Sequence, residues 1–263
     1  MIPDAIGCLV ASAHASWQPV LLQGLKAIAE NDPEYLVQLA DSDYLPTDGR
    51  IFAAFSRPLE QVQYVLIGEG PYPRAASAIG LCFMDGAVGS LWSEKGLSKE
   101  VNRATSLRNF IKMLLVAGGY ADVEHVSGDA LVNVARKAQR PESDWIRTRG
   151  DLQNNLLDHD FLLLNATLVY RTEVPPIKEA KAWLPFMQTI LAALAKHAEK
   201  KHAVPPTLVL WGKIAGQVKL LPISLQFSQV VSEHPYNLTF IGNPVMQKLF
   251  GPMHLLCRKA KPN

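Results

Sequence analysis

The sequence predicts an α/β protein, specifically a three-layer α/β/α sandwich around a central four-stranded and mainly parallel sheet. Strands that are apolar on both faces are typical of parallel sheets covered by helices. Helical patterns alternate with four such apolar runs, and a turn-forming or polar residue follows each run. The carboxyl ends of these strands are therefore expected to converge on one crevice. The four runs are Val62–Ile67, Phe161–Leu164, Thr207–Trp211 and Gln229–Val231.

The helices are predicted from apolar residues that recur at spacings of three and four. The strongest pattern runs from Ala182 to Lys201, and the chain before Pro46 is also expected to be mainly helical. A turn is expected at Thr47–Arg50. The polar stretch at about 120–148 is interpreted as an insertion. Shorter helices are expected at 51–55, 106–115 and 129–138.

Bulk composition favours a single domain over residues 1–263, because no charged or low-complexity linker divides the chain. The net charge of +2 permits binding to nucleic acid without requiring it. Cys8, Cys82 and Cys257 lack metal-site spacing, and three cysteines are too few for a four-cysteine iron–sulfur cluster. We expect no metal or organic cofactor, no membrane span, a cytoplasmic location and a monomer.

Six short motifs follow one another along the chain, with the predicted strands placed between them. They are Gly68–Tyr72, Gly80–Phe83, Ser106–Asn109, Leu162–Asn165, Leu210–Gly212 and His234-Pro235. Each motif alone is a weak signal, but their joint order resembles that of the uracil-DNA glycosylase superfamily from about Trp17 to Leu256. The resemblance implies a repair glycosylase that binds DNA and hydrolyses the N-glycosidic bond of uracil, or of a related deaminated base, flipped out of the helix.

The resemblance also implies roles for the base pocket. Phe83 would stack on the base, and Asn165 would pair with the edge of uracil, since its amide both donates and accepts hydrogen bonds. Tyr72 would exclude the methyl group of thymine, and His234 would stabilise negative charge on the departing base. Gly68 and Gly70 are expected to form part of the same pocket.

Three further positions match residues that contact DNA in the family. Leu238 corresponds to the leucine that fills the space left in the base stack, a role that apolar wedges often have. Ser106 and Thr239 match positions that hold backbone phosphates. Tyr236 adds bulk to the loop after His234, where the family has a small serine-containing segment.

The first motif departs from the most common branch of the family, which has Gly-Gln-Asp-Pro-Tyr-His. Gly70 stands at the position of the catalytic aspartate, and Pro73 at that of the histidine. Glu69 lies one residue earlier, as in the first motif of the iron–sulfur branch. A carboxylate near the sugar favours the cleavage of a glycosidic bond, so Glu69 is predicted to be catalytic.

Other interpretations remain open. Taken singly, Phe83 fits a core position, Asn165 fits a loop contact, and His234 fits a structural histidine. The missing aspartate is compatible with a degenerate family member that binds DNA, a base or a partner protein without cleavage. A different N-glycosidic or nucleotide-processing enzyme on the same scaffold is a third possibility.

Overall fold

The computed structural model describes residues 1–258, apart from the side chain of Ala215. The chain forms two compact units, each made of segments that are separated in the sequence. Unit 1 comprises residues 1–82 and 160–230, and unit 2 comprises residues 83–159 and the chain from Val231 onwards. The expectation of a single domain over residues 1–263 stays a prediction.

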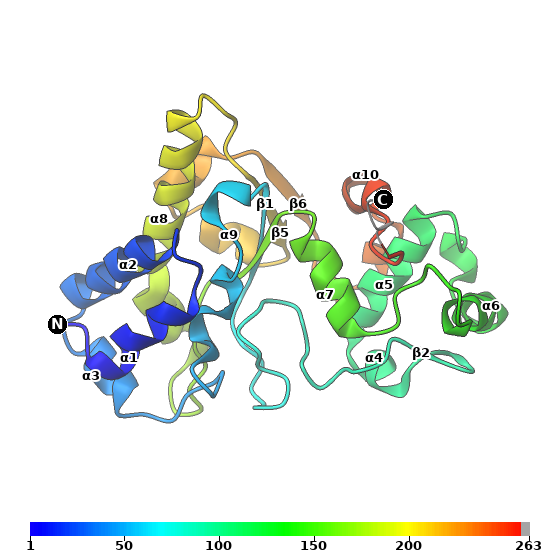
Figure 1. Ribbon diagram of the computed structural model, residues 1–263, viewed down its shortest axis with the longest axis horizontal. Coiled ribbons are helices and arrows are strands. Elements are labelled where there is room, and N and C mark those ends of the chain that lie inside the picture. The colour runs from blue at the N-terminus through cyan, green and yellow to red at the C-terminus, as the bar shows by residue number, and fades with distance from the viewer. Residues whose placement is uncertain (259–263) are drawn as a thin grey trace. The chain divides into compact units, whose positions relative to one another are not determined.

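A four-stranded sheet with the strand order β4-β1-β5-β6 is the centre of unit 1 (Figure 1). The central strand β1 pairs in parallel with both β4 and β5. The strands coincide with the four predicted apolar runs to within two residues, and the predicted fold class, an α/β protein with a mainly parallel sheet, is confirmed. Their bounds are β1 Tyr64–Gly68, β4 Phe161–Asn165, β5 Thr207–Trp211 and β6 Gln229–Ser232.

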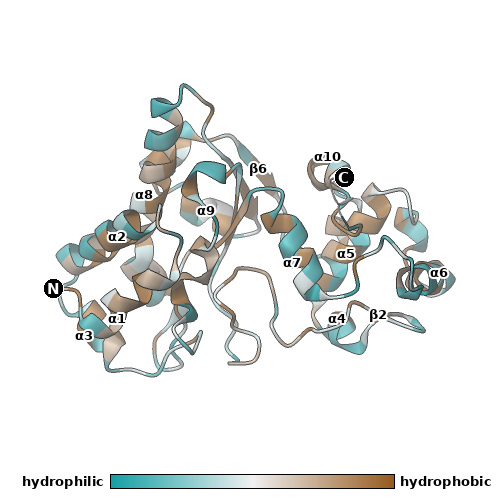
Figure 2. Ribbon diagram, viewed as in Figure 1, coloured by the Kyte–Doolittle hydropathy of each residue, from teal (hydrophilic) through white to brown (hydrophobic). Residues whose placement is uncertain are grey.

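The sheet is largely buried at its central strand β1 and at its end strand β4. All five residues of β4 are buried, and the strands of the sheet are mainly brown in the hydropathy colouring of Figure 2. The last strand, β6, is less buried than expected, because Val231 is 43% exposed and Ser232 is its one buried residue. The expectation that all four strands are buried on both faces is therefore wrong for β6.

Two long helices of unit 1 pack against each other, α2 and α8 (Figure 1). They approach so closely at Gly24 that a Cβ there would lie 2.6 Å from the ring of Phe186. Helix α8 begins at Pro176, not at Ala182 as predicted, and it continues through Pro185. The helices of unit 1 are α1 Asp4–Gly7, α2 Gln18–Asn31, α3 Tyr35–Ala40, α8 Pro176–Lys200 and α9 Ile214–Val218.

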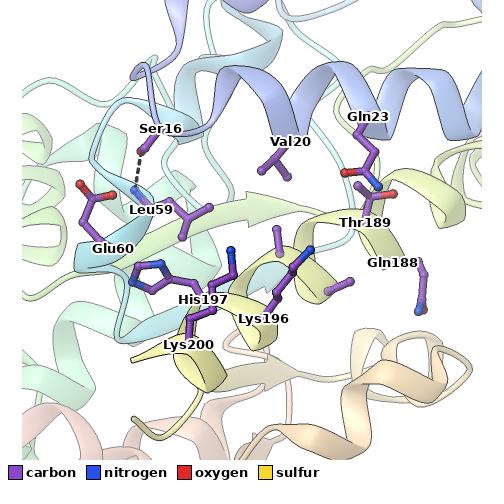
Figure 3. A pocket seen from close by; sticks show the side chains of 12 residues that line it. Ser16, Val20, Gln23, Leu59, Glu60, Gln188, Thr189, Lys196, His197 and Lys200 are labelled. Carbon is purple, nitrogen blue, oxygen red and sulfur yellow. Dashed lines mark hydrogen bonds between the residues drawn. The ribbon is translucent and has the colours of Figure 1, made fainter. Parts of the chain in front are cut away.

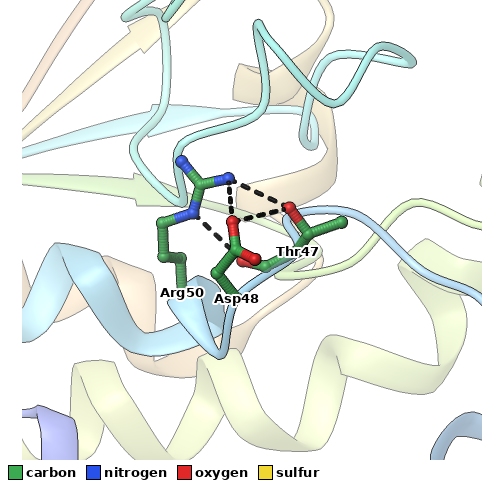
Figure 4. Close-up of polar contacts among 3 residues, drawn as sticks. All are labelled: Thr47, Asp48 and Arg50. Atoms are coloured by element: carbon green, nitrogen blue, oxygen red, sulfur yellow. Dashed lines mark hydrogen bonds and ion pairs between the residues drawn. The ribbon is translucent and has the colours of Figure 1, made fainter.

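The predicted turn at Thr47–Arg50 is confirmed, and a network of side-chain contacts holds it. The Arg50 guanidinium donates to the carbonyl of Thr47 at 3.0 Å, to its hydroxyl at 3.1 Å and to the Asp48 carboxylate at 3.1 Å (Figure 4). A 3₁₀ helix follows at Arg50–Phe55, where a short helical piece was expected. Arg50, in this turn, also places its carbonyl oxygen against Gly80.

Unit 2 is mainly helical. The predicted helices at 106–115 and 129–138 are confirmed as α5 and α6, whereas the small antiparallel pair of β2 and β3 was not predicted. Whether residues 120–148 are an insertion stays a prediction. The elements are β2 Trp92–Ser93, β3 Gly96–Leu97, α4 Lys99–Arg103, α5 Thr105–Ala117, α6 Gly128–Gln139, α7 Arg149–Leu157 and α10 Pro244–Phe250.

None of the helices in the described part of the chain combines the length and the apolar character needed to cross a lipid bilayer.

Candidate active site

The site in unit 1 is built where the parallel strands β1 and β4 end together. Gly68 is the register partner of Asn165, and the amide of Ala166 continues the pairing by donating to the Gly68 carbonyl at 2.8 Å. A Cβ on Gly68 would lie 2.8 Å from Oδ1 of Asn165 and 2.8 Å from Cβ of Cys82. Glycine is therefore required at position 68 for the strand end to approach the Asn165 amide.

The Asn165 side chain is 2% exposed, at the carboxyl end of β4. Within residues 1–258, no donor reaches its buried Oδ1 atom. A buried acceptor without a hydrogen bond costs about 1–3 kcal/mol, and such atoms in native proteins call for an explanation such as a ligand or a bound water. Asn165 therefore keeps a hydrogen-bond acceptor at the strand end that the described residues leave unused.

The catalytic candidate Glu69 lies one residue after the strand end, and its side chain is exposed. Among the described residues its carboxylate makes no ion pair or hydrogen bond. Its backbone is held more firmly, because the Glu69 carbonyl accepts from both the amide and the hydroxyl of Thr167, each at 3.3 Å. Glu69, Gly70 and Thr167 share the lining of a cavity of about 430 Å³ within unit 1.

Tyr72, the proposed size gate, is half-buried in the loop that follows Pro71. The loop is short and contains two prolines within three residues, which restrict its backbone.

The motif Gly80–Cys82 is fixed to unit 1 from two directions. Gly80 has φ +81°, and a Cβ there would lie only 2.1 Å from the carbonyl oxygen of Arg50. The Cys82 amide donates to the Leu163 carbonyl at 3.2 Å, and its thiol donates to the Leu66 carbonyl at 3.2 Å. Burial raises the pKa of this thiol, so Cys82 is a neutral packing group at the strand end rather than a nucleophile.

Phe83, the first residue of unit 2, has an unusual backbone. Its φ of +65° lies in the left-handed region, which is a genuine outlier for a bulky residue. The ring packs edge-on against Phe110 of α5, with centroids 5.2 Å apart, and Phe110 packs in turn against Phe250. Strained residues of this kind cluster at functional sites. The half-buried ring is thus oriented by α5 rather than simply enclosed in a core.

The loop after His234 is also anchored to α5. The fully buried Asn109 amide donates to the carbonyls of Pro235 at 2.8 Å and of Tyr236 at 3.3 Å. The Tyr236 backbone N–H donates to Nδ1 of His234 at 3.1 Å. Because Nδ1 accepts, the neutral imidazole carries its proton on Nε2, which makes Nε2 a hydrogen-bond donor.

The residues predicted to contact DNA belong to unit 2, and two of the three are exposed. Leu238 begins a 3₁₀ helix and is 69% exposed, although it is a large apolar residue. Thr239 follows it and is also exposed, and Ser106 lies half-buried in the first turn of α5. Tyr236 is 68% exposed, so its side chain adds bulk to the surface of this loop.

Five predicted site residues therefore belong to unit 1, where they lie at the ends of β1 and β4 or in the loop that follows β1. They are Gly68, Glu69, Gly70, Tyr72 and Asn165. The other five belong to unit 2, where they lie on α5, against it, or on the loop that Asn109 holds. They are Phe83, Ser106, His234, Leu238 and Thr239.

Two residues with clear local roles were given none from the sequence. Thr167 lies two positions after Asn165, and its hydroxyl contact with Glu69 spans 98 positions of sequence. Asn109 ends the motif Ser106–Asn109. Its position next to Phe110 in the predicted helix was the signal that could have identified it as a buried residue.

A second cavity in unit 1, of about 590 Å³, lies between α2, the end of α8 and the segment before β1 (Figure 3). Its lining includes Lys196, His197, Lys200 and Glu60, so it is at the edge of the sheet where β1 begins. No predicted site residue lines it. Within the described residues, no group of three or more His, Cys, Asp and Glu side chains is arranged to hold a metal ion.

A parallel sheet with polar residues at the carboxyl ends of its strands is the arrangement of open α/β proteins, which as a class bind their ligands at that edge. No family model matches the chain. The crystal structure of the UNG (uracil-DNA glycosylase) from Nitratifractor salsuginis is similar over 97% of this chain and 96% of that one, with 37% identity and a TM-score of 0.85. A mutant of the same protein gives 36% identity and the same TM-score of 0.85, with 97% of each chain covered.

The curated relatives are less similar in sequence, and they too are uracil-DNA glycosylases. The uracil-DNA glycosylase of Amoebophilus asiaticus is 28% identical, over 84% of this chain and 82% of its own length. That of Corynebacterium glutamicum is 27% identical, over 78% of this chain and 74% of its own length. The chain belongs to the uracil-DNA glycosylase superfamily.

Proposed function

We propose that this protein is a DNA glycosylase that hydrolyses the N-glycosidic bond of uracil, or of a related deaminated base, flipped out of DNA. The observation that carries the proposal is the buried Oδ1 of Asn165, which has no hydrogen-bond donor among the described residues. The imide N–H of uracil is such a donor, and the neighbouring carbonyl of the base accepts from the amide NH₂. Cytosine lacks this N–H, so it would leave Oδ1 unsatisfied.

Phe83 supplies the stacking surface in this scheme. Base–aromatic stacking contributes about 1–3 kcal/mol per base and does not depend on the base's identity. Stacking therefore provides affinity, whereas Asn165 and the bulk of Tyr72 provide selection. A site that hydrogen-bonds a substrate group rejects analogues without that group far better than an apolar pocket rejects a missing methyl.

His234 acts on the leaving group. As the bond between C1′ and N1 breaks, its electron pair stays on the base, which departs as an anion. The Nε2–H of His234 donates to that developing charge, and the tautomer is set beforehand by the Tyr236 N–H on Nδ1. Oriented donors of this type contribute more than mobile ones, since they need no reorganisation during the reaction.

Glu69 acts on the sugar. The sugar becomes an oxocarbenium-like cation as the base departs, and a carboxylate lowers the energy of that state. Water then adds to C1′, and its proton passes to the carboxylate. The exposed and unpaired Glu69 side chain is the carboxylate that the loop after β1 offers for this role, since position 70 has no side chain.

Leu238, Ser106 and Thr239 are assigned to the DNA itself. The large exposed side chain of Leu238 is suited to enter the base stack, where an apolar wedge keeps the duplex distorted. The hydroxyls of Ser106 and Thr239 are suited to phosphate oxygens, which fix position without reading sequence.

The test is cleavage of single- and double-stranded oligonucleotides that contain one uracil, followed by detection of the abasic product. We expect product from the wild type, and a loss of roughly 10²–10³-fold in single-turnover rate for Asn165→Ala and for His234→Ala. Glu69→Gln should lose rate with little change in DNA affinity. Glu60→Gln, which changes a glutamate at the opposite edge of the sheet, is the matched control and should keep the wild-type rate. If enzyme in excess yields no abasic product from uracil, hypoxanthine or xanthine, the proposal is wrong.

A second function is favoured by Gly70, which removes the carboxylate that the common branch of the family uses. A protein without that group could retain the base pocket and bind DNA or a base without cleavage. Such a binder would show no abasic product, and Asn165→Ala and His234→Ala would weaken its affinity for uracil-containing DNA. Cleavage of a free nucleoside without cleavage of DNA would instead indicate a nucleoside-processing enzyme.

A further inference from the structure

We infer that Thr167 is the positioning residue for Glu69, and that Thr167 and Gly70 act as a pair in which the threonine hydroxyl occupies the space of a side chain at position 70. This inference deepens the proposed function and rests on it for the role of Glu69. The steric pairing of Thr167 with Gly70 is independent of any activity.

The contacts of Thr167 extend the ladder between β1 and β4 beyond the last paired residues. After Gly68 and Asn165, the Ala166 amide donates to the Gly68 carbonyl at 2.8 Å. The Thr167 amide and hydroxyl then both donate to the Glu69 carbonyl, each at 3.3 Å. Thr167 is buried, and its hydroxyl contact with the Glu69 carbonyl lies in the wall of the cavity of about 430 Å³. The peptide that joins Glu69 to Gly70 is thereby fixed on the sheet.

The Glu69 side chain depends on that clamp. Its carboxylate is exposed and has no partner in the described part of the chain, so no side-chain contact sets its direction. The direction of its Cα–Cβ bond is set by the backbone, and the backbone is held by Thr167. Thr167 therefore acts through Glu69 and needs no contact of its own with the substrate.

Gly70 has the second contact with the same hydroxyl. A Cβ at position 70 would lie 2.6 Å from Oγ1 of Thr167, while the next nearest atoms, the Thr167 carbonyl oxygen and Cβ, are at 3.9 Å and 4.0 Å. The φ angle of Gly70 is not in the left-handed region. Of these three atoms, only the threonine hydroxyl is too close to a Cβ at position 70. Gly70, which stands at the position of the family's aspartate, is thus sterically coupled to Thr167.

The first experiment is a cycle of substitutions read out as single-turnover cleavage of uracil-containing DNA. Thr167→Val removes the hydroxyl and keeps the shape, and we expect about a fivefold to tenfold lower rate constant, with the half-saturating enzyme concentration within about twofold of wild type. Thr167→Ser keeps the hydroxyl and should recover most of the rate. In a Glu69→Gln background, Thr167→Val should cause no further loss, because the residue acts through that carboxylate. An equal loss in both backgrounds would overturn the positioning role.

The second experiment measures thermal unfolding of Gly70→Ala, Thr167→Ala and the double variant. We expect Gly70→Ala alone to lower the Tm by roughly 2–8 °C, and to have little effect when Thr167 is already alanine. The same decrease in both backgrounds would overturn the pairing. Thermal unfolding can be measured whether or not the protein cleaves DNA. If the wild type has no glycosylase activity, the proposed function is wrong, and the Tm values still test the pairing of Thr167 with Gly70.

Discussion

At the scale of single residues, Phe83 shows a conflict between backbone energy and proposed role. A left-handed conformation costs about 1–2 kcal/mol for a residue with a Cβ, and Phe83 adopts it with φ +65°. Its ring packs on Phe110, which offsets part of that cost. Glycine would remove the strain, so the presence of phenylalanine favours a function that needs the ring.

Two substitutions separate the strain from the function. Phe83→Ala and Phe83→Gly should both lose uracil cleavage by a large factor, since both remove the stacking surface. Phe83→Gly should nevertheless be more stable than Phe83→Ala by about 1 kcal/mol, because only glycine accepts a positive φ without strain. Chemical denaturation of the two variants measures this difference. Equal stabilities would mean that the backbone here is not strained.

Sequence reasoning identified Phe83 and Gly80 from their motif, but it could not show why they occupy those positions. The requirement for glycine at Gly80 comes from the carbonyl of Arg50, thirty positions earlier. The link between Thr167 and Glu69 spans 98 positions. Such contacts depend on how distant segments pack, and neither composition nor local periodicity contains that information.

At the scale of elements, apolar periodicity predicted the strands and α5 well, because burial of one stripe or one run is a local signal. It failed at the start of α8. Pro175, Pro176 and Pro185 suggest an irregular segment, whereas the helix begins with Pro176 in its first turn, where no N–H is needed, and tolerates Pro185 within it. The small β2–β3 pair was missed because two-residue strands have no detectable period.

Helix α7 illustrates how one carboxylate stabilises an element in a pH-dependent way. Thr148 caps the helix, and the Asp151 carboxylate accepts from the backbone N–H groups of Arg147 at 3.0 Å and Thr148 at 2.9 Å. Burial alone would raise the pKa of Asp151, but these hydrogen bonds outweigh it, and the pKa is lower than its usual value. The charged form is therefore favoured in the folded protein.

Asp151→Ala should destabilise the protein by about 1 kcal/mol at neutral pH, as expected for a helix cap. A carboxyl group whose pKa is lowered by folding contributes stability above its unfolded value, about pH 4, and loses it as the pH falls through the folded pKa. The difference between variant and wild type should therefore shrink below about pH 4. Asp129→Ala is the matched control, because Asp129 lies in the first turn of α6, whose N-cap makes no side-chain bond. A pH-independent difference for Asp151→Ala would contradict this account.

At the scale of the whole molecule, composition predicted the broad class but not the division into two units. The chain passes between the units after Cys82, His159 and Val230, so each unit is assembled from separate segments. No linker of distinctive composition marks such a division, because the segments on either side continue as ordinary elements. β6 itself begins in one unit and ends in the other. Five of the ten candidate residues belong to each unit, because the segments that carry them are divided between the two units.

The charge of the whole chain makes a prediction about how it binds DNA. With 26 basic and 24 acidic residues, the protein has little excess positive charge to displace counterions from the phosphates. The proposed phosphate contacts, Ser106 and Thr239, are neutral hydroxyls. We expect the logarithm of the affinity for uracil-containing DNA to fall with the logarithm of salt concentration with a slope of roughly −2 to −4, which corresponds to about two to four ionic contacts. Fluorescence anisotropy between about 50 and 200 mM salt, using the Glu69→Gln variant to prevent cleavage, measures it. A slope steeper than about −6 would show that a concentrated basic surface binds the DNA instead, and that the hydroxyls contribute little.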